Sequence, residues 1–312
     1  MPTTKTVWID TDVAIGMGDP RQGFADVDDA WAMVHLFHAP HIEVRGVSTV
    51  FGNTDIDNAT RLAKEICEQF GPSEVKVHRG SAEAIKLDQI ISNSGVEAMI
   101  KALEQEALHI MAIGPATNVA LCLILRPDLA SQILSVVLVA GRRSLEQHFR
   151  VSPTHDPAFP DLNFDLDPNA FRILLQSEVP VVLLPFEISH KTWIDQSDLD
   201  AVRQMGEVGE YLALNSQNWL ELWREFGCEA FNPFDILASA YLVDESGFEW
   251  EDWTYQLVLA WDDTVPATEN SHQRLKPYFL LNEGLSGSRK IRYCHTPPEN
   301  FKQDLLRYMA KP

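Results

Sequence analysis

VWIDTD at residues 7–12 and DDAWAMVHLFH at residues 28–38 are the stretches of sequence that decide the fold of this chain. The apolar start of the first stretch is typical of a short buried strand, which places Asp10 and Asp12 at its carboxyl end. The second stretch has apolar residues at helical spacing and is followed by Pro40, so it predicts a helix. A buried strand followed by a helix is the start of a βαβ unit.

Strand-like and helical segments alternate along the next part of the chain. Strands are expected at 42–50, 75–77, 108–113, 135–139 and 181–184, and helices at 54–70, 95–106, 117–125 and 167–176. Further on, 208–243 is helix-rich, 255–261, 276–281 and 289–293 resemble strands, and 298–309 resembles a last helix. This alternation predicts an α/β fold, an open and mainly parallel sheet flanked by helices, with extra helices and strands in the C-terminal third.

Composition narrows the class of protein. The 312 residues contain no internal repeat and no clear linker, so we expect a single domain over 1–312. With 25 basic and 45 acidic residues the net charge is −20, which disfavours nucleic-acid binding and suits a cation or a neutral substrate. No apolar run reaches the ~18 residues of a membrane span, and the first residues resemble no signal peptide. A cytoplasmic protein without membrane contact is therefore expected.

Acids and an amide gather where the expected strands end. They are Asp10 and Asp12 after the first strand, Asp26, Asp28 and Asp29 at the following helix, and Asn53 after the second strand. In open α/β sheets the ligand crevice lies at the carboxyl ends of the strands. A cluster of carboxylates there would bind a hard divalent cation, calcium or magnesium in preference to zinc. The alternative is helix capping by Asp26 and Asp28 together with solvated loop acids.

Seven segments, in order along the chain, resemble the motifs of one known enzyme family. They are the aspartates at 10–12 and 28–29, STVFGN at 48–53, IGPATNVA at 113–120, VVLVAG at 136–141, DLN with DP at 161–168, PFEISHK at 185–191 and NPFDILA at 232–238. Over about residues 5–245 the chain thus resembles the nucleoside hydrolases of the inosine-uridine-preferring type, which have a Rossmann-like fold. Compared with that family, residues 14–25 are an expected loop insertion beside the pocket mouth.

The resemblance implies a reaction and a set of site residues. It implies calcium-dependent hydrolysis of the N-glycosidic bond of ribonucleosides, which gives ribose and the free base. Asp12 would be the general base and a calcium ligand, with Asp29, Asp235 and the Ile113 carbonyl as further ligands and Asp10 holding the loop behind them. The ribose would be bound by Asp28, Asn53, His155, Asp161 and Asn163. A homo-oligomer, dimeric or tetrameric, is also implied.

The base-binding side departs from the family pattern. Phe234 stands where many members have a histidine that protonates the leaving base, and phenylalanine cannot donate a proton. Trp219 and Trp223 are spaced i, i+4 on an expected helix, so with Phe234 they could stack a purine. Purine ribonucleosides are the expected preference. The alternative for this aromatic stripe is packing in the core.

Two other functions remain open at this stage. The chain could be a catalytically weak or inactive relative that binds a ribosylated metabolite, because the histidine is missing and the lid region is altered. It could also be a magnesium-dependent phosphohydrolase, since a DxD motif at a strand end serves such enzymes too. The phosphohydrolase motif normally continues DxDxT, whereas this chain reads DTDVA at 10–14. Turnover of nucleosides distinguishes a hydrolase from an inactive relative, and release of phosphate from a phosphomonoester would indicate the phosphohydrolase.

Overall fold

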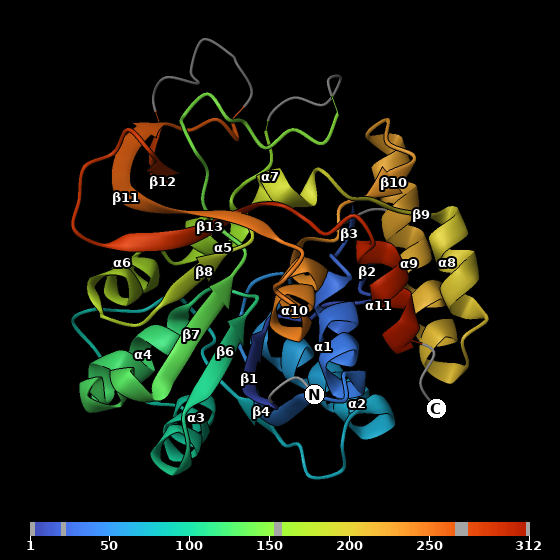
Figure 1. Cartoon of the computed structure of the whole chain (residues 1–312), viewed down its shortest axis with the longest axis horizontal. Coiled ribbons are helices and arrows are strands. Elements are labelled where there is room, and N and C mark those ends of the chain that lie inside the picture. The colour runs from blue at the N-terminus through green and yellow to red at the C-terminus, as the bar shows by residue number, and fades with distance from the viewer. Residues whose placement is uncertain (1–3, 20–22, 153–157, 266–273, 310–312) are drawn as a thin grey trace.

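The structure is a computed structural model that describes residues 4–19, 23–152, 158–265 and 274–309. Its main sheet has nine strands in the order β12-β11-β13-β8-β7-β6-β1-β4-β5 (Figure 1). The pairs from β13 to β5 are parallel, whereas β11 pairs antiparallel with β12 and with β13. The predicted α/β fold is confirmed, including the extra strands near the C-terminus. The strands are β1 Lys5–Thr11, β4 Ile42–Thr49, β5 Val77–Arg79, β6 Leu108–Ala112, β7 Ile133–Leu138, β8 Val181–Leu183, β11 Glu249–Trp261, β12 Leu275–Asn282 and β13 Lys290–Thr296.

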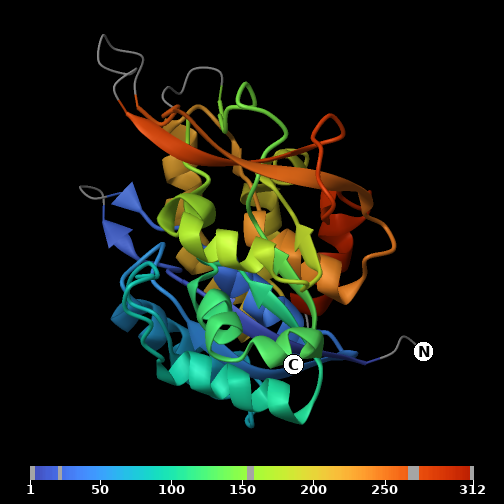
Figure 2. The same ribbon diagram turned by 90° about the vertical axis from the view of Figure 1, so that its left-hand side faces the viewer.

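Helices cover both faces of the sheet. Figure 1 shows α3 and α4 on one side of the central strands and α1 and α10 on the other, and Figure 2 shows β11 and β12 crossing the top of the molecule. The helices are α1 Asp28–His38, α2 Ile56–Phe70, α3 Ser94–Gln105, α4 Thr117–Leu125, α5 Leu162–Leu166, α6 Pro168–Gln176, α7 Phe186–Ser189, α8 Gln196–Arg203, α9 Glu207–Glu225, α10 Phe234–Val243 and α11 Phe301–Met309, with a 3-10 turn at Pro127–Gln132.

Strand β1 shows why a short apolar run forms a central strand. Val7 and Ile9 point into the core cluster on the α1 side, whereas Trp8 points into the cluster on the α3 and α4 side. Successive side chains of a strand face opposite sides of the sheet, so a strand covered on both sides must be apolar throughout. The Trp8 indole also donates a hydrogen bond to Ser48 Oγ at 2.8 Å, which ties β1 to β4.

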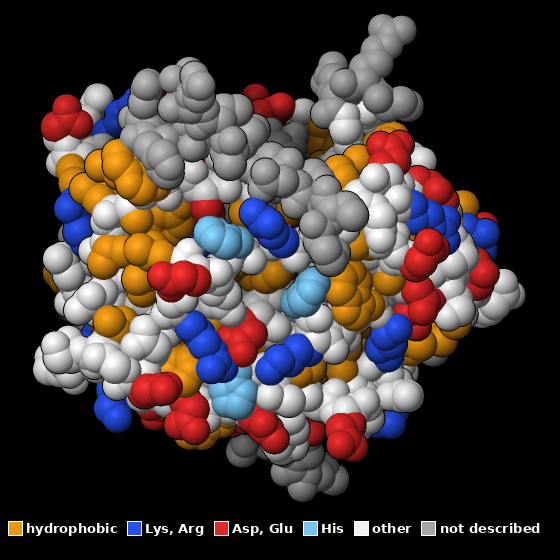
Figure 3. Space-filling model, turned by 90° about the horizontal axis from the view of Figure 1, so that it is seen from above, with side chains coloured by type: hydrophobic (Ala, Val, Ile, Leu, Met, Phe, Trp, Pro, Cys, Tyr) orange, Lys and Arg blue, Asp and Glu red, His pale blue; other side chains and the backbone are white. Residues whose placement is uncertain are grey.

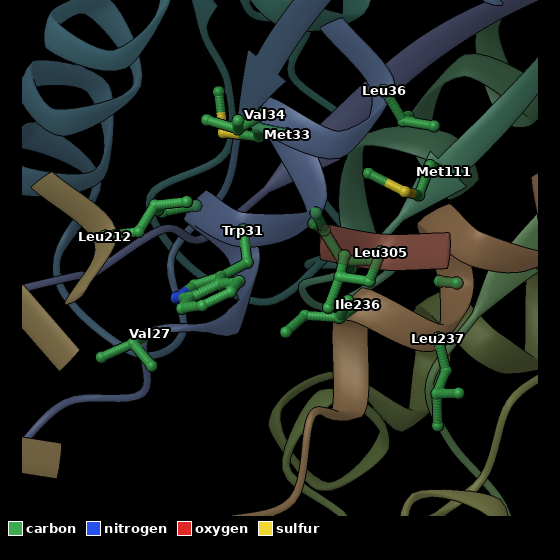
Figure 4. Packing of buried hydrophobic residues seen from close by; sticks show 14 of the residues in the cluster. Val27, Trp31, Met33, Val34, Leu36, Met111, Leu212, Ile236, Leu237 and Leu305 are labelled. Carbon is green, nitrogen blue, oxygen red and sulfur yellow. The ribbon is translucent and has the colours of Figure 1, made fainter. Parts of the chain in front are cut away.

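The packing of α1 against α10 brings two helix N-termini together. Figure 4 shows Trp31 of α1, Ile236 and Leu237 of α10, and Leu305 of α11 in one buried cluster. The Trp31 indole donates a hydrogen bond of 3.0 Å to Ser216 Oγ, which fixes α9 against α1. The first residues of α1 and α10 therefore meet at one edge of the sheet.

Two expected boundaries were wrong in detail. We expected α2 to open at Thr54, but the cap is Asp55, whose side chain accepts hydrogen bonds from the N–H groups of Asp57 and Asn58. We also expected a strand at 75–77, but Val75 lies in a turn, bonded to the Pro72 carbonyl, and β5 begins at Val77. A side-chain cap sets the first boundary, and a backbone turn hydrogen bond sets the second.

The expected loop at 14–25 begins in the core and then forms a small ribbon. Ala14 and Ile15 are buried, and β2 Gly18–Asp19 pairs antiparallel with β3 Gly23–Phe24. Gly16 has φ of +73° and lies so close to Asn215 of α9 that a Cβ would be 2.6 Å from its Oδ1. The segment thus packs on α9, near the edge where β1 ends.

Two observations concern membrane spans and the charge of the surface. In the part of the chain that the structure describes, none of the helices is both long and apolar enough to span a bilayer. Figure 3 shows one face of the molecule, on which acidic and basic side chains are interspersed with apolar ones.

Candidate active site

Backbone hydrogen bonds extend the parallel pairing one residue past the strands and bring the predicted site segments together. Val50 N donates to the Thr11 carbonyl at 2.9 Å, and Ile113 N donates to the Asp10 carbonyl at 2.8 Å. The loops after β1, β4 and β6 therefore leave the sheet side by side. This is the edge at which open parallel sheets bind ligands.

Asp12 is fully buried and is held by the loop after β4. Its Oδ2 accepts a hydrogen bond of 2.8 Å from the backbone N–H of Asn53. The side-chain nitrogen of Asn53, Nδ2, lies 3.4 Å from Asp12 Oδ1 and 3.4 Å from Asp29 Oδ2, so it bridges the two carboxylates. Gly52 leaves the room for this contact, because a Cβ there would lie 1.8 Å from Asp12 Oδ2.

The paired N-termini of α1 and α10 hold a cluster of three buried carboxylates. Asp28, Asp29 and Asp235 each offer an oxygen, and these oxygens lie within 4.8 Å of one another. Asp28 Oδ2 accepts a hydrogen bond of 2.7 Å from the backbone N–H of Asp235, and Asp29 Oδ1 accepts one from the Thr11 hydroxyl. The N–H groups and dipoles at helix N-termini favour negative charge, which suits the aspartates in the first turn of both helices.

Burial and mutual repulsion disfavour ionisation of these aspartates. Burial, and then the charge of Asp28, raises the pKa of Asp29 to about 7. The pKa values of Asp12 and Asp235 are raised well above the ordinary value, by burial first and by the neighbouring carboxylates second. A bound cation would offset both effects. The donors are oxygens throughout, so they fit a hard cation such as calcium or magnesium.

Two further residues that were predicted to bind the ribose, Asn163 and Asp161, line the cavity beside these carboxylates. Asn163, in the first turn of α5, donates through Nδ2 to the carbonyls of Ile113 and Val139, each at 3.2 Å. The Ile113 carbonyl, one residue past β6, thus accepts a hydrogen bond from α5. Asp161 Oδ2 accepts a hydrogen bond of 2.8 Å from Gly141 N, and burial raises the pKa of Asp161 to about 7.

Asp10 is fully buried and is not part of the described cavity lining. Its Oδ1 accepts hydrogen bonds from Ser48 Oγ at 2.6 Å and Asn118 Nδ2 at 2.8 Å. Asn118 also accepts from the backbone N–H of Ser81 at 3.0 Å and donates to the Thr49 carbonyl at 3.0 Å. Asn118 thus joins β1 to the end of β4 and to the loop after β5, and α4 has no side-chain cap.

A cavity next to the carboxylates is lined by both polar and aromatic side chains. Its polar lining consists of Asp26, Asp28, Asn53, Asp161, Asn163 and Asp235, and its aromatic lining consists of Phe149, Phe159, Phe186, Trp219, Trp223 and Phe234. Asp12 and Asp29 are fully buried and do not line the cavity themselves. Both are within hydrogen-bond distance of Asn53, which does line it. The predicted His155 lies outside the described residues.

A sequence model of inosine-uridine preferring nucleoside hydrolases matches residues 7–278. The chain belongs to this family. It is 29% identical to a probable uridine nucleosidase 1 of rice over 213 residues, which cover 60% of this chain and 64% of that protein. It is 28% identical over 204 residues to the pyrimidine-specific ribonucleoside hydrolase RihA of Klebsiella pneumoniae strain 342, with 57% and 63% covered. The matched stretch thus spans less than two thirds of these curated relatives.

Solved nucleoside hydrolases share the fold over nearly the whole chain. A purine-preferring ribonucleoside hydrolase from Gardnerella vaginalis superposes with a TM-score of 0.76 at 20% identity, with 98% of both chains covered. A plant nucleoside hydrolase superposes with a TM-score of 0.75 at 18% identity, with 99% of both chains covered. At such identities these likenesses establish the nucleoside hydrolase fold, not the substrate.

The aromatic residues that line the cavity were the hardest part of the site to predict from the sequence. Phe234 packs with Trp223 at a ring-centroid distance of 6.2 Å and with Phe186 at 6.0 Å, and Trp219 lies 6.1 Å from Trp223. These residues line the cavity and also contact the core, so both interpretations of the stripe hold in part. We missed Phe186, which directly follows Pro185 at the end of β8 and could have been found from that position.

Two more lining residues, Phe149 and Phe159, were also missed. Both come from the irregular segment between β7 and α5, which has no periodicity to predict their direction. His190 is exposed and stacks on Phe186 at a ring-centroid distance of 5.4 Å; it is not part of the described cavity lining.

Proposed function

We propose that this chain hydrolyses the N-glycosidic bond of ribonucleosides in a calcium-dependent reaction and prefers purine bases. One observation carries the proposal. Four buried carboxylates, Asp12, Asp28, Asp29 and Asp235, converge beside a cavity that is lined by both polar groups and aromatic rings. A ribose carries hydroxyls and a base carries a flat apolar face, so a nucleoside matches both kinds of lining.

Calcium is the cation that we propose for the carboxylates. Asp12, Asp29, Asp235 and the Ile113 carbonyl would hold it, and Asp28 adds a fourth carboxylate to the cluster. The strongest support is the group of three carboxylates whose oxygens approach within 4.8 Å, since calcium takes six to eight oxygen ligands in flexible geometry. When bound, such a cation would lower the pKa of an attacking water.

The side chains around the cation would then carry the reaction. Asp12 accepts the proton of the water. Asn53 holds the carboxylate of Asp12 beside that of Asp29. Asp28, Asn53, Asp161 and Asn163 bind the ribose hydroxyls, in contacts that tighten as the ring approaches the flat, positively charged transition state. Asp161 reaches less far than the glutamate common in the family, and its hydrogen bond to Gly141 N fixes its direction.

The aromatic side would bind the base. Trp219, Trp223 and Phe234 present rings to the cavity, and a purine covers more ring area than a pyrimidine. The curated relatives named above act on pyrimidine nucleosides or uridine by name, so the purine preference rests on the aromatic lining of this chain alone.

Turnover of a nucleoside panel tests the proposal. Purified protein with calcium should release equimolar ribose and base from inosine, with a higher kcat/KM for inosine than for uridine. Binding of nucleosides without measurable release of ribose would favour the alternative, a relative that binds a ribosylated metabolite and does not cleave it.

The predicted homo-oligomer, the cytoplasmic location and the single domain over 1–312 stay predictions.

A further inference from the structure

Arg142 is the one arginine, among those that the structure describes, that is almost fully buried. It is 1% exposed, and its Nη1 lies 2.7 Å from Oδ2 of Asp263, whose side chain is 8% exposed. Its Nε and Nη2 have no hydrogen-bond partner among the described residues. Replacing a buried ion pair with apolar side chains often costs no stability, so stability alone does not account for a cation at this place.

The backbone and the side chain of Arg142 are both fixed against β12. Arg142 N donates to the Phe279 carbonyl at 3.0 Å, and Leu281 N donates to the Arg142 carbonyl at 2.9 Å. The guanidinium carbon Cζ lies 4.9 Å from the ring centroid of Tyr278, whose hydroxyl donates to Asp263 Oδ1 at 2.9 Å. The guanidinium therefore has a defined place relative to the sheet.

This guanidinium contacts a ring of the cavity lining. Its Cζ lies over the Phe149 ring, 4.1 Å from the centroid, and Phe149 stacks on Phe186 at 4.6 Å with 12° between the ring planes. Both rings line the cavity, whereas Arg142 does not. Phe149 lies in no helix or strand, so these two contacts restrict its ring in place of a regular element. A guanidinium over an aromatic face attracts the ring more strongly when it is desolvated, as Arg142 is.

We propose that Arg142 is a positioning residue for base binding: paired with Asp263, it holds the Phe149 ring against Phe186 and so keeps the aromatic lining in the shape against which a base packs. This inference rests on the proposed function and deepens it, because it assigns the base to this part of the lining. The planar guanidinium is the essential group, since it covers a ring face in a way that the ammonium of lysine does not.

Asp161 provides the competing explanation. Gly141 N donates to Asp161 Oδ2 at 2.8 Å, and Asp161 also lines the cavity. If Arg142 served this carboxylate, its loss would weaken the binding of ribose. If Arg142 serves Phe149, its loss weakens the binding of the base and leaves ribose binding unchanged. The two explanations therefore differ in which reaction product loses affinity.

Calorimetric titration with hypoxanthine and with ribose tests the inference. Arg142→Met combined with Asp263→Asn removes both charges, so no unpaired charge remains in the interior. This charge-free variant should bind hypoxanthine ~10-fold more weakly, about the factor that a desolvated cation–π contact supplies, and should bind ribose as wild type does. Arg292→Met is the matched control, because Arg292 lies over Trp250 at 3.7 Å and neither lines the cavity. The control should bind both products as wild type does.

A double-mutant cycle shows whether Arg142 acts through Phe149. Phe149→Leu should itself weaken hypoxanthine binding, and its combination with the charge-free variant should bind no more weakly than Phe149→Leu alone. Losses that multiply would show two independent effects and would overturn the inference. If circular dichroism shows the charge-free variant to be unfolded, Arg142→Lys takes its place in the cycle, because it keeps the ion pair and removes the planar group.

Two further results would overturn the inference. They are an unchanged affinity for hypoxanthine in the charge-free variant and an equal loss of affinity for ribose. The titrations need no turnover, so they separate this inference from the proposed function. A selective loss of hypoxanthine binding in a protein that cleaves no nucleoside would support the inference and contradict the function. Normal cleavage of inosine by a charge-free variant with the wild-type affinity for hypoxanthine would contradict the inference alone.

Discussion

Gly52→Ala should remove most of the activity by displacing a single carboxylate. Gly52 does not adopt a positive φ, so alanine meets no backbone strain there. Its Cβ, however, would lie 1.8 Å from Asp12 Oδ2 and 2.7 Å from Asp12 Cγ. Non-bonded carbon and oxygen approach to about 3.5 Å at the optimum, so the carboxylate or the loop must move by more than ~1 Å.

Displacements of this size at a reacting group cost about 100-fold in rate. We therefore expect kcat for inosine to fall ~100-fold in Gly52→Ala while the fold persists. The assay is steady-state release of ribose at saturating calcium, with circular dichroism to verify folding. Gly287→Ala is the matched control, because its Cβ would find only Thr254, at 3.6 Å. A Gly52→Ala protein that retains more than a third of the wild-type kcat would refute the position or the role that we assign to Asp12.

Three further predictions concern charge and the leaving group. Asp12→Asn should fold but lose at least ~100-fold in kcat, a usual size for a general base; near-normal turnover with calcium bound would exclude Asp12 as the base. Burial raises the pKa of Asp161 to about 7, so the folded state binds the proton of this side chain more tightly than the unfolded state does. The free energy of unfolding therefore falls as pH rises from about 4 to 7. Thermal unfolding between pH 5 and pH 8 should therefore show a smaller loss of Tm for Asp161→Asn than for wild type, and an equal loss would contradict this. A nitrophenyl riboside, whose leaving group needs no proton, should be cleaved faster than inosine; equal rates would show that another residue already supplies the proton.

The fold was predictable from sequence because it depends on local patterns. The alternation of apolar strands and helices predicts the parallel sheet, and the run at Val7–Ile9 predicts a strand buried on both faces. Competing side-chain hydrogen bonds are not visible in such patterns. The cap at Asp55 and the bonds of Asn118 to Asp10 were therefore missed or misassigned, since each depends on which neighbour the fold brings close.

The carboxylates were harder to predict than the strands. Nothing in the spacing of the sequence places Asp235 against Asp28, 207 positions away, and only the family resemblance suggested that they share a site. The aromatic lining was predicted where a helix presents it, at Trp219 and Trp223, and missed at Phe149, where the chain is irregular. Directions of side chains in irregular segments follow from tertiary packing and leave no periodic signal.

Calcium titration of the chelated protein tests the central claim most directly. Protein treated with a chelator should cleave inosine at a negligible rate, and activity should return with added calcium and saturate at one ion per chain. The carboxylates around Asp29 and Asp235 provide the reason, because a bound cation would offset their mutual repulsion. Full inosine hydrolysis by protein that elemental analysis shows to be free of metal would contradict the account, as would a calcium-saturated protein that cleaves no ribonucleoside.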